Sequence, residues 1–316
     1  STWDPIFWQL LFMLLCIGVI IKGVKGGIEK WSKIMMPLII ILLIIIAIRG
    51  MTLDGGMEGI SFLFKPRFGD LTASAIVLAL GHSFFTLSLG MGTMITYGSY
   101  LKKEGNLLNS ALWVIALDTA IAMLAGVAIF TTVFALGANP AEGPGLIFVV
   151  LPSVFSQMVG GWLWGSLFFF LLFMAALTSA ISILEVVTAY FIDQKGWSRE
   201  KATVLFGSII IVVGLFCSLS NGGFTDFKYV FGISFMDFMD YLSSKYMLPI
   251  GGMLIAIFII KHWTVDEFLK EINTGMKSTI ISTQLITVLL SIAAFVVGFI
   301  ILNEIIAKLT GTAIIG

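Results

Sequence analysis

The chain has 316 residues, of which 59% are hydrophobic and 11% are charged, and its formal net charge is zero. A soluble domain carries about a quarter charged residues, so this composition excludes an ordinary soluble protein. The zero net charge argues against nucleic acid as a partner. The two cysteines, Cys16 and Cys217, lie in separate apolar stretches and the two histidines stand alone, which argues against a disulfide framework or a metal cluster.

Long apolar stretches predict an all-α integral membrane protein, because several of them approach the ~20 residues that a bilayer core requires. We predict eight membrane-spanning segments, at about 6–21, 34–49, 74–101, 107–136, 162–192, 202–219, 231–260 and 279–302. If the loops alternate between the two sides, one side holds twelve Lys and Arg residues, and the other holds six when Arg49 and Lys245, which lie inside two of the segments, are counted with it. The positive-inside rule makes the richer side cytoplasmic. We therefore expect a multi-pass protein of the cell membrane, in contact with the lipid bilayer.

The start of the second segment carries Gly27 and Pro37, ten positions apart. Proline removes a backbone donor and clashes with the preceding turn, and glycine weakens a helix. This pair predicts a cytoplasmic helix end that can unwind and admit water. The alternative is an ordinary loop glycine and a first-turn proline.

The third segment contains "FFTLSLGMGTMITYGSY", with Thr86, Ser88, Gly90 and Gly92 in the middle of an apolar span. These residues predict a break in the helix. Backbone that leaves the helix at membrane depth is tolerated only against protein or a water-filled cavity. The freed carbonyls and the half-helix ends would suit small ions and charged groups. The alternative is a small-residue contact between two helices.

Acidic residues within the spans are the next signal, because such residues are costly in lipid and mark pathways or charge pairs. They are Asp118, Glu185, Asp237 and Asp240, with Asp193 at a cytoplasmic end. No cation lies in the span of Asp118, which favours ion coordination over a structural charge pair.

The fifth segment contains "AALTSAISILE", in which Ala175, Thr178 and Ser179 are spaced i, i+3, i+4 and share one helical face. Carbonyl and hydroxyl oxygens are hard ligands, so sodium fits this face better than a transition metal. The alternative is that the Thr and Ser hydroxyls bond to carbonyls of their own helix. The seventh segment contains "DFMDYLSSKYMLPIGG", whose Pro249 and two glycines predict a second broken span.

Several of these motifs together resemble the neurotransmitter:sodium symporter family, in particular its bacterial amino-acid transporters with the LeuT fold. The motifs are "FFTLSLGMGTMITYGSYL", "LPSVFSQMVGG", "FFFLLFMAALTSAIS" and the spacing of Gly27 and Pro37. The resemblance covers essentially the whole chain and implies one transporter domain over 1–316. The eight spans would be family helices four to eleven of an inverted-repeat bundle. By the positive-inside rule the chain enters the membrane from outside, and it begins at Ser1 rather than at a methionine. Both features agree with the expectation of an N-terminal truncation, with the first three helices belonging to the complete protein.

The resemblance also implies a role for particular residues. The substrate-binding positions would be Phe85, Thr86, Ser88, Gly90, Met91, Met94, Ser179 and Ile183, with Phe85 as an aromatic lid. The first sodium site would use Thr86 and Asp118, and the second would use Ala175, Thr178 and Ser179. The gates would be Asp240 on the outer side and Asp193 with Tyr100 on the inner side, and the usual arginine partners of both gates are absent. Gly27 and Pro37 would form a conformational hinge.

The function that follows is sodium-coupled symport of a neutral, hydrophobic L-amino acid by alternating access, with sodium and the amino acid as ligands. Met91, an uncharged pocket residue, favours a hydrophobic side chain. Ala122 stands where chloride-dependent relatives have serine, and Asp118 already supplies a negative charge, which predicts chloride independence. The alternative is a non-transporting remnant or membrane scaffold that needs a partner chain. An enzyme is not expected, because the sequence shows no Ser–His arrangement and no metal cluster.

Overall fold

The computed structural model describes residues 3–102, 105–135, 137, 139–140, 146–220, 232–274 and 282–310, and every regular element in these ranges is a helix. The chain divides into two compact units. One contains Ser1–Ile21, Leu71–Ile115 and Ser182–Gly316, and the other contains Lys22–Asp70 and Ala116–Ile181.

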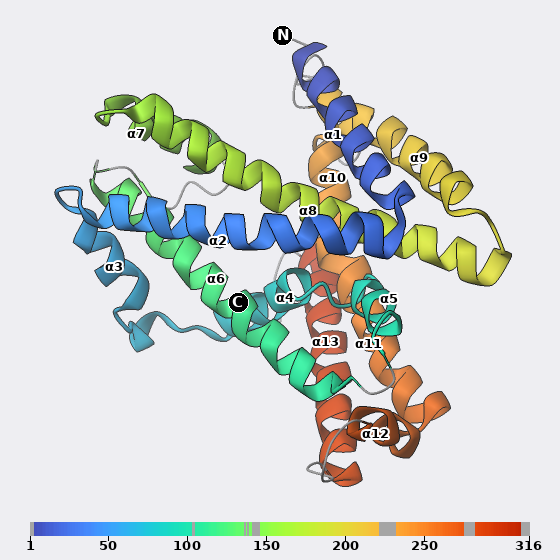
Figure 1. The fold of residues 1–316 in the computed structure, drawn as a ribbon. Coiled ribbons are helices and arrows are strands. Elements are labelled where there is room, and N and C mark those ends of the chain that lie inside the picture. The colour runs from blue at the N-terminus through green and yellow to red at the C-terminus, as the bar shows by residue number, and fades with distance from the viewer. Residues whose placement is uncertain are drawn as a thin grey trace. The chain divides into compact units, whose positions relative to one another are not determined.

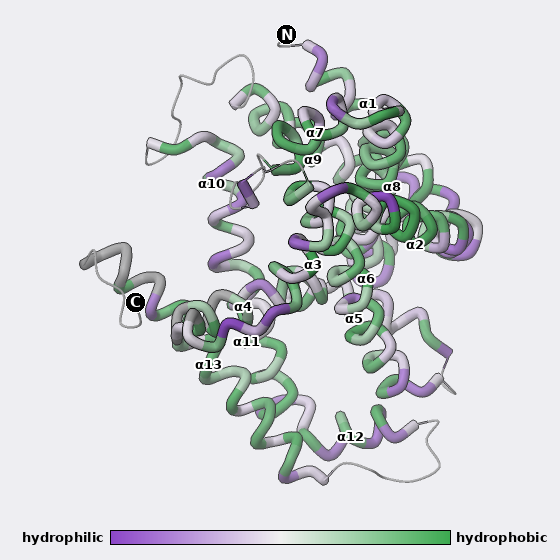
Figure 2. Tube along the Cα trace, turned by 90° about the vertical axis from the view of Figure 1, so that its left-hand side faces the viewer, coloured by the Kyte–Doolittle hydropathy of each residue, from purple (hydrophilic) through white to green (hydrophobic). Residues whose placement is uncertain are grey.

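The first unit contains two pairs of closely packed helices (Figure 1), α1 with α9 and α11 with α13. Its helices are α1 (Trp3–Ile21), α4 (Ala73–Thr86), α5 (Thr93–Ser99), the first part of α6 (Leu107–Ala135), the end of α8 (Gly161–Lys195), α9 (Arg199–Ser220), α10 (Phe235–Leu242), α11 (Leu248–Phe258), α12 (Val265–Asn273) and α13 (Thr283–Thr310). Figure 2 shows that the long helices are mainly hydrophobic, whereas α10 and α12 carry many hydrophilic residues.

Gln9 joins α1 to α9 through polar groups at membrane depth. Its Nε2 donates to the Ile211 carbonyl at 3.1 Å, and its Oε1 accepts from the Ser218 hydroxyl at 2.5 Å. Gly214 makes room for the Gln9 side chain, since a Cβ there would lie 2.4 Å from Nε2. Because an unpaired amide is costly in lipid, these bonds hold α1 in one register on α9.

The second unit contains α2 (Lys30–Met51), α3 (Gly56–Phe64), most of α6 (Leu107–Ala135), α7 (Leu151–Gln157) and the first part of α8. The short helix α3 packs closely on the end of α6. A Cβ at Gly59 would lie 2.4 Å from the Phe130 carbonyl, and the Phe62 ring lies 5.1 Å from each of the Phe130 and Phe134 rings. Glycine and aromatic side chains thus bring the two helices together.

Seven helices within the described residues are long and apolar enough to cross a membrane. They run over Trp3–Ile21, Val24–Met51, Leu107–Ala135, Gly161–Lys195, Arg199–Ser220, Phe235–Trp263 and Thr283–Asn303. The remaining predicted segment, 74–101, is divided into α4 and α5, each shorter than a span. The protein is an all-helical, multi-pass membrane protein, as predicted.

The predicted break in the seventh segment is wrong. Phe235–Trp263 stays helical and passes through π-helical turns at Ser243–Met247 and Ile259–Trp263. Pro249 has no N–H for the carbonyl of Lys245, four residues earlier, and its ring would clash there in an α-helix. The wider turn avoids this clash, and the Leu248 N–H donates to the Ser243 carbonyl, five residues earlier.

The start of α2 also differs from an ordinary loop. Gly27 is buried in a π-helical turn over Val24–Glu29, and Pro37 lies inside α2, beyond its first turn. The alternative of a loop glycine and a first-turn proline is therefore wrong. The predicted unwinding of this region stays a prediction.

Candidate functional site

The predicted break in the third segment is confirmed. Helix α4 ends at Thr86, and α5 begins at Thr93. Three residues between them have positive φ, namely Ser88 at 53°, Gly90 at 81° and Gly92 at 86°. Glycine adopts this conformation at little cost, and a serine there is uncommon. The backbone therefore leaves the helix in the middle of an apolar segment.

Local hydrogen bonds close the end of α4. The carbonyls of Ser83, Phe84 and Phe85 accept from backbone N–H groups at 3.1, 2.8 and 3.1 Å, donated by Leu87, Leu89 and Ser88. A helix end leaves its last four carbonyls without helical partners, so these bonds satisfy most of them. The turn is thus a defined structure rather than a frayed helix.

The break lies directly against α11. A Cβ at Gly90 would lie 2.1 Å from the Leu248 carbonyl oxygen, and a Cβ at Gly251 would lie 2.1 Å from the Gly90 carbonyl oxygen. Only glycine fits at a backbone-to-backbone contact this close. From the sequence alone, a small-residue contact between two helices is the alternative to a break. The structure has both, because Gly90 and Gly251 form such a contact at the break itself.

Helix α5 contacts the end of α8 at several points along its length. Gly92 faces Val186, because a Cβ at Gly92 would lie 3.0 Å from Val186 Cγ1. Further along α5, the hydroxyls of Tyr97 and Ser182 are hydrogen-bonded at 2.7 Å. The inner part of the broken segment is therefore fixed to α8, whereas the break itself contacts α11.

A buried carboxylate, Glu185, lies at the far end of α5. Its side chain is 0% exposed, its Oε1 accepts from the Tyr100 hydroxyl at 2.5 Å, and its Oε2 accepts from Arg199 Nη1 at 2.7 Å. A buried charge is tolerated only when it is paired and hydrogen-bonded. Tyr100, Glu185 and Arg199 thus form one network that joins α5, α8 and α9.

The sequence alone did not identify this network as part of the site. Tyr100 was predicted as an inner-gate residue without an arginine partner, yet Arg199 reaches it through Glu185. The available signal was the fourteen-residue spacing of Glu185 and Arg199 across the short turn between α8 and α9. Asp193, the other predicted inner-gate residue, is exposed near the end of α8.

The predicted second sodium site lies on α8. The Thr178 hydroxyl donates to the Ala175 carbonyl at 2.8 Å, so the alternative, a bond to the same helix, is present. Ser179 and Ile183 are both exposed and lie one turn apart. A hydroxyl that donates one hydrogen bond keeps its lone pairs for a cation, so this face retains oxygen ligands.

The remaining predicted residues are distributed over both units. Thr86 belongs to the first unit and Asp118 to the second, so the first sodium site stays a prediction. Phe85 and Met94 are exposed beside the break. Asp240, the predicted outer-gate residue, is exposed on α10, and its Oδ1 accepts from the Ser244 hydroxyl at 3.0 Å.

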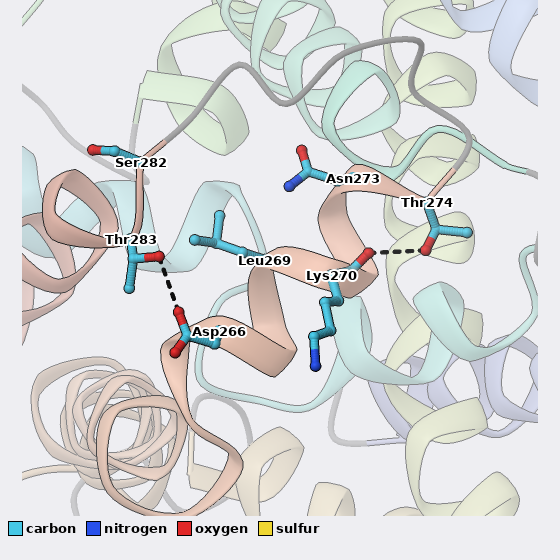
Figure 3. A pocket seen from close by; sticks show the side chains of 7 residues that line it. All are labelled: Asp266, Leu269, Lys270, Asn273, Thr274, Ser282 and Thr283. Atoms are coloured by element: carbon cyan, nitrogen blue, oxygen red, sulfur yellow. Dashed lines mark hydrogen bonds between the residues drawn. The ribbon is translucent and has the colours of Figure 1, made fainter.

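A pocket of about 930 Å³ lies elsewhere, between α12 and the start of α13 (Figure 3). Asp266 accepts a hydrogen bond from Thr283 at 3.0 Å across it. Lys270, at its edge, is paired with Glu267, whose carboxylate raises the pKa of the lysine. None of the predicted site residues lines this pocket.

Residues 2–313 match the sequence model of the sodium:neurotransmitter symporter family. The chain belongs to this family. It is 42% identical over 267 residues to the uncharacterized sodium-dependent transporter YhdH of Bacillus subtilis, a match that covers 84% of this chain and 59% of that protein. It is 40% identical over 281 residues to an uncharacterized sodium-dependent transporter of Haemophilus influenzae, covering 89% of this chain and 61% of that protein.

Among solved structures, the chain is similar to MhsT, whose crystal structure is a complex with L-phenylalanine. The TM-score is 0.83 at 44% identity, over 94% of this chain and 67% of MhsT. These matches confirm the predicted family and the LeuT-type fold. The family is one of sodium symporters rather than enzymes. The chain spans about three fifths of the length of these two curated relatives.

Proposed function

We propose that the protein containing this chain is a sodium-coupled symporter of a neutral, hydrophobic L-amino acid that works by alternating access. The observation that carries this proposal is the break between α4 and α5, which places irregular backbone inside an apolar segment. Such backbone lines binding sites in transporters built on broken helices. The similarity to MhsT, which binds L-phenylalanine, supports an amino acid as the substrate.

Two groups of oxygen ligands are proposed for sodium. Ala175, Thr178 and Ser179 on α8 would form one site, and Thr86 with Asp118 would contribute to the other. Each sodium ion that enters down a membrane potential releases about 2.3 kcal/mol per 100 mV. That energy supports roughly a 50-fold gradient of substrate. The residues of the break, with Ile183 from α8, would line the substrate pocket.

The network of Tyr100, Glu185 and Arg199 would act as an inner gate. It holds the last residues of α5 on α8 and α9, so opening toward the cytoplasm requires its charge-assisted hydrogen bonds to break. Alternating access then corresponds to two states that differ in whether α5 is attached at this end.

The first test is sodium-dependent binding of L-phenylalanine to the purified full-length protein. Replacing Thr178→Val and Ser179→Ala together should lower the affinity for sodium at least about tenfold, because two hydroxyl ligands are lost. The matched control is Thr287→Val with Ser291→Ala on α13, whose hydroxyls also bond to carbonyls of their own helix. Unchanged sodium affinity in the α8 variant would refute that site. A folded wild-type protein without sodium-dependent binding would favour the scaffold alternative.

The second test concerns chloride. The carboxylate of Asp118 is proposed to supply the negative charge that chloride provides in other relatives. Asp118→Asn should therefore reduce sodium-driven uptake and create a requirement for chloride, measured by exchanging chloride for gluconate in the uptake medium. An Asp118→Asn variant whose remaining uptake is indifferent to chloride would contradict chloride independence by this mechanism.

A further inference from the structure

A short turn, 196–198, joins α8 to α9 and is flanked by a cluster of aromatic side chains (Figure 1). The Phe191 ring lies 4.8 Å from the Trp197 ring and 4.5 Å from the Phe206 ring, and Trp197 stacks on Phe206 at 6.4 Å. Lys201 covers the indole, with its Nζ 4.3 Å from the ring centre. Aromatic pairs and cation–π contacts stabilise a fold beyond the burial of their area. The cluster therefore joins the end of α8, the turn and the start of α9.

The backbone of the turn is fixed at the same place. Gly196 has a φ of 65°, and its N–H donates to the Ile192 carbonyl at 3.0 Å. The Trp197 N–H donates to the Phe191 carbonyl at 3.2 Å. Many helices end at a glycine with positive φ, and an apolar contact across the ending often accompanies it. Phe191 and Trp197 supply that contact, so a backbone bond and a ring contact join the same two residues.

Arg199, two residues beyond Trp197, is the first residue of α9. A cation in the first turn of a helix is disfavoured by the helix dipole, so the helix itself does not hold Arg199 in place. The Arg199 side chain is 23% exposed, whereas that of its partner Glu185 is 0% exposed. Water therefore competes for the guanidinium but not for the carboxylate. Whether Arg199 reaches Glu185 thus depends on how the turn directs the start of α9.

From this arrangement we propose that Trp197 is a positioning residue for the inner gate, because its packing holds the start of α9 so that Arg199 faces Glu185. The inference rests on the proposed function, since it presupposes that the network of Tyr100, Glu185 and Arg199 forms a gate. Trp197 acts indirectly, through Arg199. Without the indole the turn loosens, Arg199 turns toward water, and the end of α5 leaves α8 more often.

The experiment measures how often α5 leaves α8, and it does not depend on transport. Thr93, the first residue of α5, is 3% exposed and is replaced by cysteine in the full-length protein, with Cys16 and Cys217 replaced by alanine. A membrane-impermeant methanethiosulfonate reagent is added to inside-out membrane vesicles. Trp197→Ala should raise the labelling rate about tenfold. Trp197→Phe, which keeps a ring against Phe191, should stay within about twofold of wild type.

A double-mutant cycle separates positioning from general stabilisation. Glu185→Gln with Arg199→Gln removes the buried charges and should itself raise labelling, and adding Trp197→Ala should then raise it no further. A further rise as large as in the wild-type background overturns the proposal. The matched control is Phe216→Ala, which removes a 5.8 Å ring contact with Phe235 at the other end of α9. It should lower the thermal unfolding temperature without faster labelling, and an equal gain in labelling would also contradict a role for Trp197 at the gate.

The two levels of the inference fail in different ways. If the variant with both glutamines labels no faster than wild type, the inner gate of the proposed function is refuted, and Trp197 has no gate to position. If that variant labels faster but Trp197→Ala does not, only the role of Trp197 is refuted. Trp197→Leu, which keeps apolar volume without a ring, repeats the measurement if Trp197→Ala does not fold, and it should raise labelling about threefold.

Discussion

The segments at 74–101 and 231–260 carry the same sequence features but resolve them differently. Each has polar residues and a closely spaced pair of glycines, Gly90 with Gly92 or Gly251 with Gly252, in an apolar stretch. The first leaves the helix between Thr86 and Thr93, whereas the second stays helical and widens into a π-turn before Pro249. The difference lies in φ, because Gly90 and Gly92 are at positive φ, while Gly251 and Gly252 lie inside α11. Glycine therefore allows the backbone to leave the helix in the first segment, and in the second it leaves room for the backbone of the first.

Of the two regions, the break should lose more stability when a glycine is substituted. Gly90→Ala should lower the free energy of unfolding by about 3 kcal/mol or more, because it adds strain at positive φ and a Cβ 2.1 Å from the Leu248 carbonyl oxygen. Thermal unfolding in detergent measures this loss. Gly81→Ala in α4 is the matched control, since a Cβ there meets nothing within 4 Å, and it should leave stability unchanged or slightly higher. Equal effects of the two substitutions would contradict the close contact with α11.

The inner end of the broken segment differs from the π-turn in that side-chain hydrogen bonds hold α5 on α8. Tyr100→Phe removes a hydrogen bond to a buried carboxylate and should cost about 1.5–3 kcal/mol, whereas Tyr97→Phe removes a neutral bond to Ser182 and should cost about 1 kcal/mol. Both are measured by thermal unfolding together with sodium-driven uptake. If the inner-gate proposal holds, Tyr100→Phe also shifts the protein toward the inward-open state. A larger loss from Tyr97→Phe would show that the buried carboxylate does not dominate this contact.

The two regions also show how far the sequence could predict the structure. Gly90, Gly92 and their polar neighbours located the break correctly, because glycines beside polar residues suit backbone that lies against protein or water rather than lipid. The same expectation failed at Pro249, since one wider turn accommodates a proline without unwinding the helix. Glu185 was recognised as an ionisable residue in a span, but its partners were not, because they lie on α5 and α9 and meet it only after the chain folds. The second sodium site and the gate residues remain predictions for the same reason. Their roles depend on groups that come together in space rather than in sequence.

A substitution at the π-turn should have the smallest effect on the free energy of unfolding, and it tests directly whether the two segments differ. Pro249→Ala restores a backbone N–H that could donate to the Lys245 carbonyl, and it removes a ring that packs in a buried position. These changes oppose each other, so the free energy of unfolding should change by less than about 1 kcal/mol. Sodium-driven uptake should fall more than stability does, because closing the turn to α-helical geometry would rotate α10, which carries Asp240, relative to α11, which contacts the break. If Pro249→Ala destabilised the protein as much as Gly90→Ala, the second segment would depend on its irregular backbone as strongly as the first, and the two segments would not differ in this respect.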